Sequence, residues 1–360
     1  MDNIQALRAI AALLVVWIHW GGVCQEAFPK VVCPLILDNS FGGVGVDIFF
    51  IISGFVISLT VAKRHSGSVD FFLARIARIA PLYLVFMFYE IVRHAGLYSL
   101  KSIWNGFFYL PVFDFGAYTT PPVTVGWTLS FEMWFYLAFA LFLIKLRPRQ
   151  VAVVLPAFFL GSSLVAIFYT GSWFLPHFLF HPLVLEFALG CIIYQTRGWF
   201  RGPISYVFVV LGILGLVLSW PYVAVIDAPD KELGAGIAVA WARVLIWGVP
   251  CALLVAGLVG LEQSRGIVLP RFLVSMGAIS YAMYLTHITV LSGMERIVRL
   301  LPSPLVGGII LYLTCIAVAW VVHVYVERPL TVRAQQLAKR IALWRSSRRE
   351  SVGVLVVPES

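Results

Sequence analysis

The chain has 360 residues, of which 61% belong to the apolar and aromatic set AVILMFWYC and only 12% are charged. An average globular domain has about 25% charged residues, and a body of this size cannot hide so many apolar side chains from water. The composition therefore excludes a soluble enzyme, a disordered chain, collagen and a coiled coil. Apolar stretches of about 20 residues recur along the chain, so the sequence predicts an all-α, polytopic helical membrane protein.

Hydropathy predicts about ten transmembrane helices. In chain order they are expected near residues 4–22, 41–62, 79–97, 127–144, 151–170, 177–196, 203–220, 237–261, 274–294 and 305–326. Residues 1–330 are thus expected to form one integral-membrane domain, followed by a basic cytoplasmic tail at 331–360. That tail is expected either to be solvated or to lie on the anionic inner leaflet through an apolar helix face.

The basic residues are distributed unevenly between the two sides of the membrane. One set of alternate loops, together with the C-terminal tail, carries 18 Lys and Arg, whereas the opposite set carries six, namely Lys30, Arg93, Lys101, Lys231, Arg296 and Arg299. Because basic loops stay in the cytoplasm, both termini are expected there. The net charge of +9 then reflects topology and indicates no nucleic-acid partner. Cys24 and Cys33 share the first outer loop, and the sequence leaves open whether they are bridged.

The first predicted helix carries two ionisable residues, Arg8 and His19. Eleven positions at 100° each return to within about 20° of the same face, roughly 16 Å along the axis, so the two side chains share one stripe at two depths. A charged residue within the membrane costs roughly 2.5–3.5 kcal/mol and needs a reason. Arg8 alone would be explained by snorkelling to the headgroups, and a lone histidine by a hydrogen bond between helices.

Three further ionisable residues are expected at the depth of His19. Topology places Asp47, Glu132 and His287 in the outer half of the second, fourth and ninth helices. Two histidines and two carboxylates in one dry layer indicate a site for acid/base catalysis. Ser53, Ser130 and Trp127 lie on the same second and fourth helices, and the two serines are candidate carriers of a covalent intermediate.

On the cytoplasmic side, Arg75 and Arg78 precede the third predicted span. Residues at i and i+3 share a helix face, so with Arg8 they would form a cluster suited to a phosphorylated ligand. The alternative explanation is the positive-inside rule alone.

The chain resembles the membrane acyltransferase 3 family in seven segments that follow the family's order. They are Arg8 with His19 in the first helix, GVDIFFIISGF at 45–55, RIARIAPLY at 75–83, WTLSFEMWFY at 127–136, EFALG at 186–190, SYAMYLTH at 280–287 and ERPL at 327–330. The resemblance implies transfer of an acyl group, usually acetyl, from cytoplasmic acyl-CoA to a carbohydrate hydroxyl, with no metal. It assigns the essential histidine and its arginine to His19 and Arg8, the arginine pair to Arg75 and Arg78, and the acid of the tryptophan motif to Glu132.

The first and fourth helices look most like the branch that acetylates bacterial exopolysaccharide, which implies the bacterial inner membrane and a lipid-linked oligosaccharide or polysaccharide as acceptor. In the implied mechanism His19 is the general base, Glu132 or Asp47 orients it, and His287 is a second base or binds the acceptor. A covalent acyl-histidine or acyl-serine intermediate remains an alternative to direct transfer. The rival function is a secondary transporter or sugar-lipid flippase that uses the same charges as a proton relay. The motifs specify neither the acceptor hydroxyl, the acyl chain, the face of transfer nor the oligomeric state.

Overall fold

The computed structural model describes residues 1–28, 39–64, 67–114, 117–119, 121–169, 174–226 and 237–354. Cys33 lies outside these ranges, so the question of a bridge to Cys24 lies outside the described residues.

Helices dominate the described residues, with one two-stranded antiparallel hairpin, in which Val112 pairs with Thr119. In chain order the elements are α1 (Asp2–Ala27), η1 (Asn39–Gly43), α3 (Val44–Arg64), α4 (Ser68–Arg93), α5 (Leu100–Phe107), β1 (Val112–Asp114), β2 (Ala117–Thr119), η2 (Thr124–Gly126), α6 (Trp127–Phe142), α7 (Pro148–Phe168), α8 (Phe174–Leu179), α9 (Val184–Thr196), α10 (Ile204–Leu218), η3 (Trp220–Tyr222), α11 (Val223–Ile226), α12 (Ile237–Arg243), η4 (Val244–Gly248), α13 (Val249–Arg265), α14 (Arg271–Gly277), α15 (Ser280–Val298), α16 (Pro304–Val322), η5 (His323–Glu327) and α17 (Arg328–Val354).

The helices confirm the predicted class of a polytopic membrane protein. Among the described residues, eight helices are long and apolar enough to cross a membrane, and α14 with α15 forms a ninth candidate that bends by 75°. The remaining predicted span, 203–220, corresponds to the shorter apolar helix α10. Apolar side chains cover much of the outer surface, as expected where the surrounding solvent is lipid.

Glycines let some of these helices approach backbone to backbone. A Cβ atom on Gly54 of α3 would lie 2.0 Å from the carbonyl oxygen of Phe187, and one on Gly190 of α9 would lie 2.1 Å from that of Ile51. Without a hydrophobic force between helices in lipid, such close van der Waals packing holds membrane bundles together. The α3/α9 pair therefore forms a rigid wall of the bundle.

Helix α1 runs through the middle of the bundle and packs against α3, α14 and α15. A Cβ atom on Gly277, the last residue of α14, would lie 2.2 Å from the carbonyl oxygen of Gln5 in α1. This contact fixes the start of α1 against the bend between α14 and α15. The central position of α1 places Arg8 and His19 where several helices meet.

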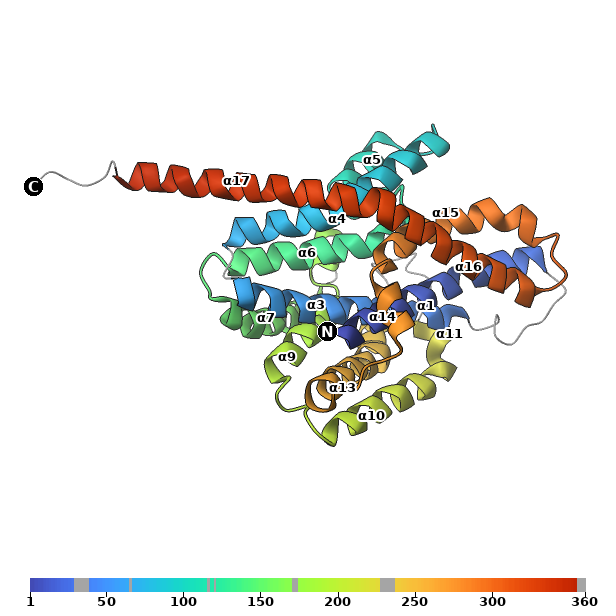
Figure 1. Cartoon of the computed structure of the whole chain (residues 1–360), viewed down its shortest axis with the longest axis horizontal. Helices are drawn as coiled ribbons and strands as arrows, with labels where there is room; N and C mark the ends of the chain where they lie inside the picture. The colour runs from blue at the N-terminus through green and yellow to red at the C-terminus, as the bar shows by residue number, and fades with distance from the viewer. Residues whose placement is uncertain are drawn as a thin grey trace, which may run out of the picture.

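Helix α17 continues the chain beyond α16 and runs alongside α4 before extending past the body of the molecule (Figure 1). Arg345 Nη1 donates to Asp70 Oδ1 at 3.3 Å, which ties the two helices together. The apolar residues Val332, Leu337 and Trp344 are exposed on α17.

Candidate active site

The two transmembrane histidines that the sequence places at similar depth are in contact. His19 comes from α1 and His287 from α15, and their ring centroids are 4.9 Å apart. His19 Nδ1 lies 3.3 Å from His287 Nε2. His287 is fully buried, whereas His19 is half-buried.

Backbone carbonyls determine which nitrogens of this pair carry protons. His19 Nδ1 lies 2.9 Å from the carbonyl oxygen of Val15, and His287 Nδ1 lies 3.1 Å from that of Met283. Because a carbonyl only accepts, we assign a proton to each Nδ1, which leaves His287 Nε2 as an acceptor for the same Nδ1–H of His19. In the neutral ring His19 Nε2 is then an unprotonated base, and it has no hydrogen-bond partner among the described residues.

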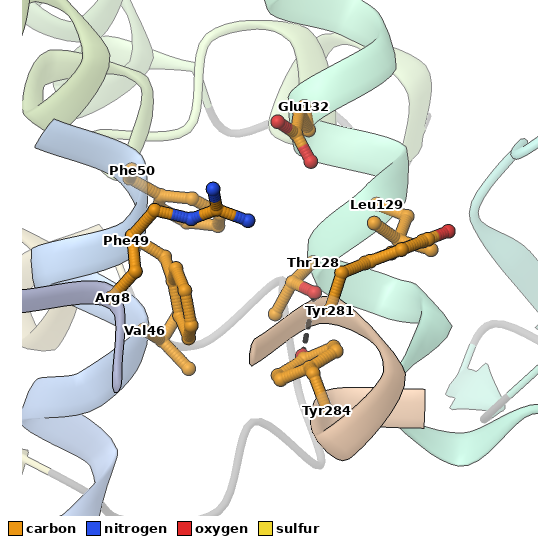
Figure 2. Close-up of a pocket in the computed structure, with 9 residues that line it drawn as sticks. All are labelled: Arg8, Val46, Phe49, Phe50, Thr128, Leu129, Glu132, Tyr281 and Tyr284. Carbon is orange, nitrogen blue, oxygen red and sulfur yellow. Dashed lines mark hydrogen bonds between the residues drawn. The ribbon is translucent and has the colours of Figure 1, made fainter. Parts of the chain in front are cut away.

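Arg8 and Glu132 lie on a cavity of about 100 Å³ on the Arg8 side of the histidine pair. Figure 2 shows the Arg8 guanidinium and the Glu132 carboxylate pointing toward each other across it. The cavity is lined by Arg8, Val46, Phe49, Phe50, Thr128, Leu129, Glu132, Tyr281 and Tyr284. The ring centroid of Tyr284 lies 5.9 Å from that of His287, so this tyrosine connects the cavity to the histidine pair.

Glu132 is held on α6 by two hydroxyl groups. Ser53 Oγ donates to its Oε1 at 3.0 Å, and the hydroxyl of Tyr136 donates to the same oxygen. The expected contact between Glu132 and an imidazole is therefore absent: within the described chain, both histidines lie against backbone carbonyls and each other. Its neighbour Ser130 is buried, Trp127 packs edge-on against Phe131, and neither is among the described residues that line the cavity.

Asp47 is engaged elsewhere, which corrects the expectation that it orients His19. It lies in the first turn of α3 and is fully buried. Arg243 holds it with two bonds, from Nε to Oδ1 at 3.1 Å and from Nη2 to Oδ2 at 2.9 Å. Arg243 also donates to the carbonyl oxygen of Gly43 at 3.1 Å. A planar guanidinium satisfies a carboxylate bidentately, so the two charges neutralise each other in the core.

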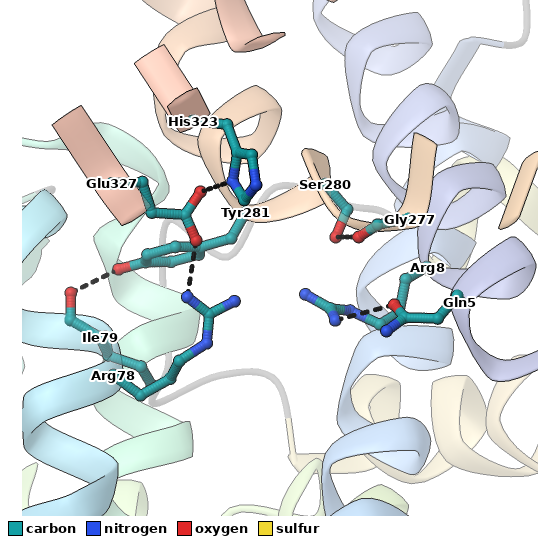
Figure 3. Close-up of polar contacts among 9 residues, drawn as sticks. All are labelled: Gln5, Arg8, Arg78, Ile79, Gly277, Ser280, Tyr281, His323 and Glu327. Atoms are coloured by element: carbon teal, nitrogen blue, oxygen red, sulfur yellow. Dashed lines mark hydrogen bonds and ion pairs between the residues drawn. The ribbon is translucent and has the colours of Figure 1, made fainter. Parts of the chain in front are cut away.

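Arg78 is fixed beside the cavity residue Tyr281 by a network that the sequence does not reveal. Its Nη1 lies 2.6 Å from Glu327 Oε1, and His323 Nδ1 lies 2.7 Å from Glu327 Oε2. Tyr281 donates to the carbonyl oxygen of Ile79 at 2.8 Å, and its ring lies beneath the Arg78 guanidinium. Figure 3 shows the guanidinium groups of Arg78 and Arg8 facing each other. The ERPL segment at 327–330 was the one signal that could have pointed to Glu327.

Arg75 and Arg78 line a second space, the basic cleft of about 440 Å³ between α4 and α17. Its wall is formed by Thr60, Asp70, Ala74, Arg75, Arg78, Gln335, Ala338, Lys339 and Ala342. Three cations and a single carboxylate give this cleft a positive balance. Arg78 thus borders the cleft while facing Arg8, so the three predicted arginines form one series from the cleft to the cavity.

The two histidines and the three arginines fall within a known family domain. The model of the Acyl_transf_3 family, described as an acyltransferase domain, matches residues 1–324. The exopolysaccharide production protein ExoZ of Rhizobium meliloti (strain 1021) is 29% identical over 320 residues, which cover 84% of this chain and 93% of that protein. The acyltransferase MdmB of Streptomyces mycarofaciens is 26% identical over 91% of each chain.

A further relative is nodulation protein 10 of Rhizobium leguminosarum bv. viciae, which is 26% identical and covers 81% of this chain and 83% of its own length. No solved structure matches the chain significantly. The family match spans most of the chain and includes both histidines and all three arginines of the series. The chain therefore belongs to the Acyl_transf_3 family and is an integral-membrane acyltransferase.

Proposed function

We propose that the protein transfers an acetyl or other short acyl group from cytoplasmic acyl-CoA to a hydroxyl of an exported or cell-surface carbohydrate, such as an exopolysaccharide, in the bacterial inner membrane. The names of the relatives support this substrate class, because one is an exopolysaccharide production protein. The observation that carries the proposal is the placement of His19: its Nδ1 lies 2.9 Å from the Val15 carbonyl oxygen, and its Nε2 has no partner among the described residues. It lies eleven residues along the same helix face from Arg8.

In this proposal the donor enters through the basic cleft. The phosphates of the nucleotide bind Arg75, Arg78 and the exposed Lys339, since arginine and lysine side chains are the usual ligands of phosphate groups. The pantetheine arm continues past Arg8 along α1. His19 lies roughly 16 Å beyond Arg8 along that helix, a distance that a long, flexible arm is needed to cover.

Direct transfer then uses the histidine pair as a general base. His19 Nε2 takes the proton of the acceptor hydroxyl as its oxygen attacks the thioester carbonyl carbon. The carbon–sulfur bond breaks, and the proton passes from His19 to the departing thiolate, so that an ester and free CoA are formed. His287 accepts the Nδ1–H of His19 and stabilises the imidazolium that forms, which is the role an aspartate has in a serine hydrolase triad.

A covalent route through Ser53 is the second version of this mechanism. The hydroxyl of Ser53 donates to Glu132 at 3.0 Å, which is the arrangement of a nucleophile beside its base. The acyl group would pass first to Ser53, with release of CoA, and then to the acceptor. A covalent route, unlike direct transfer, produces a burst of free CoA in the absence of acceptor.

Purified full-length protein should release free thiol from acetyl-CoA when the polysaccharide acceptor is present. Mass spectrometry of polysaccharide from cells with and without the gene should show a loss of acyl mass in its absence. If purified protein consumes no thioester and the polysaccharide mass is unchanged, the proposed function is wrong.

A further inference from the structure

A pocket of about 540 Å³ lies between the ends of α4 and α15. It is lined by Arg93, Ser292, Gly293, Glu295, Arg296 and Arg299, and we refer to it as the outer basic pocket. Three of the six basic residues that the sequence assigns to the outer side of the membrane thus converge on one space. The positive-inside rule disfavours basic residues on that side, so a cluster there calls for a local reason.

The outer basic pocket and the basic cleft lie at opposite ends of α4. Arg93 follows Arg78 by fifteen residues on α4, which is roughly 22 Å along the axis. On α15, Tyr281 contacts Ile79 near the cleft, whereas Ser292 is eleven residues further on. His287 lies between them. A ligand in this pocket would therefore approach the histidine pair from the side opposite to the donor.

The lining retains uncompensated positive charge. Glu295 is the single acid among the lining residues, and it pairs with Arg299. Arg93 donates to Ser292 Oγ at 3.0 Å and lies 4.0 Å from Glu90, which is loose for an ion pair. Arg296 is exposed and forms no hydrogen bond or ion pair with any residue in the described part of the chain.

We propose that the outer basic pocket binds an anionic group, a carboxylate or a phosphate, of the carbohydrate acceptor. This inference rests on the proposed function and adds that the acceptor is acidic. Arginine forks bind such groups bidentately, and the Ser292 hydroxyl adds a donor. Ser292 and Arg296 follow His287 by five and nine residues, roughly 8 and 14 Å along the axis. The anion therefore lies on a different part of the acceptor from the hydroxyl that reacts.

The test uses full-length protein in nanodiscs of phosphatidylcholine, with fluorescent trigalacturonate as the acidic probe and maltotriose as the neutral one. Trigalacturonate should bind about tenfold more tightly or better, and added salt should reduce the difference. Arg296→Gln with Arg299→Gln should weaken its binding about tenfold, because two solvent-exposed ionic contacts are lost. Lys101→Gln, a matched loss of a positive charge on the predicted outer side but outside the lining, should leave binding unchanged.

A steric variant tests the pocket without changing its charge. A Cβ atom on Gly293 meets no atom within 4 Å, so Gly293→Trp should leave the helices packed while filling the pocket. It should weaken trigalacturonate binding as much as the double arginine variant does, with acetyl-CoA binding unaffected. Equal binding of the two trisaccharides, or full binding by both pocket variants, would overturn the proposal.

An acidic lipid headgroup has the same chemistry as the proposed ligand, and a change of lipid separates the two. If nanodiscs containing phosphatidylglycerol abolish trigalacturonate binding, the pocket is a lipid site and the proposal is wrong. Trigalacturonate binding that persists in those nanodiscs supports it. Failure of the proposed function would be visible separately, as wild-type protein that consumes no acyl-CoA.

Discussion

Two clusters of ionisable side chains, Asp47 with Arg243 and Arg8 with His19, differ in how many of their polar atoms are hydrogen-bonded within the protein. Asp47 and Arg243 satisfy each other bidentately, and the Arg243 guanidinium also lies 5.0 Å from the ring centroid of Trp247. In the other cluster, within the described residues, Arg8 forms one hydrogen bond, to Gln5 at 3.1 Å, and His19 Nε2 forms none. Charged side chains that bond only to other residues of the protein hold helices together. Charged side chains that line a cavity can bind a ligand instead.

Replacing the free base should give the largest effect. His19→Ala should lower the rate of acyl transfer by about 10²–10⁴-fold, the usual contribution of a general base, with the unfolding temperature in detergent nearly unchanged. Thiol release from acetyl-CoA measures the rate. His287→Gln is the matched variant, and it should cost less because His19 Nε2 remains. An unaltered rate in His19→Ala would show that this histidine is structural, like Asp47.

Replacing one member of the Asp47–Arg243 pair should lower stability and leave the chemistry of transfer intact. Asp47→Ala should lower the free energy of unfolding by about 3–5 kcal/mol, because Arg243 is left buried without its partner. The double variant Asp47→Leu with Arg243→Leu should recover much of that stability and retain activity. The measurement is unfolding in detergent, followed by thiol release from the folded fraction. If the double variant is stably folded but inactive, Asp47 takes part in catalysis.

Replacing Arg8 tests whether its guanidinium binds the acyl donor. Arg8→Ala should raise the KM for acetyl-CoA by about ten- to a hundredfold, since a hydrogen bond to a charged group is worth about 1.5–3 kcal/mol. Arg8→Lys should recover only part of this, because an ammonium lacks the planar fork. An unchanged KM together with a lower unfolding temperature would place Arg8 in the structural class.

The smallest effect is expected at the rim of the basic cleft. Lys339 is exposed on α17, and an exposed ionic contact contributes about 0.2–1 kcal/mol. Lys339→Ala should therefore raise the KM for acetyl-CoA by at most about fivefold, and the increase should shrink at high salt. Lys145→Ala, an exposed lysine outside the cleft, is the control and should show no change.

The sequence predicted positions along helices better than contacts between them. Hydropathy located the spans, and helical periodicity with topology placed His19 and His287 at a common depth, where the structure brings them together. Asp47 was misassigned because its partner, Arg243, is 196 residues away, and helical periodicity does not determine which helix faces which. The pairing of Glu132 with Ser53, 79 residues apart, was missed for the same reason.

The contact between His19 and His287 depends on Gly277, the last residue of α14, which packs against the start of α1. Gly277 lets the Gln5 carbonyl settle against the bend that leads into α15, and any larger side chain would meet that oxygen. Because a helix transmits a displacement along its length as a stiff rod, a single added methyl group there would shift His19 relative to His287. The geometry of the histidine pair thus depends on the close contact between Gly277 and Gln5, about 20 Å away along α1.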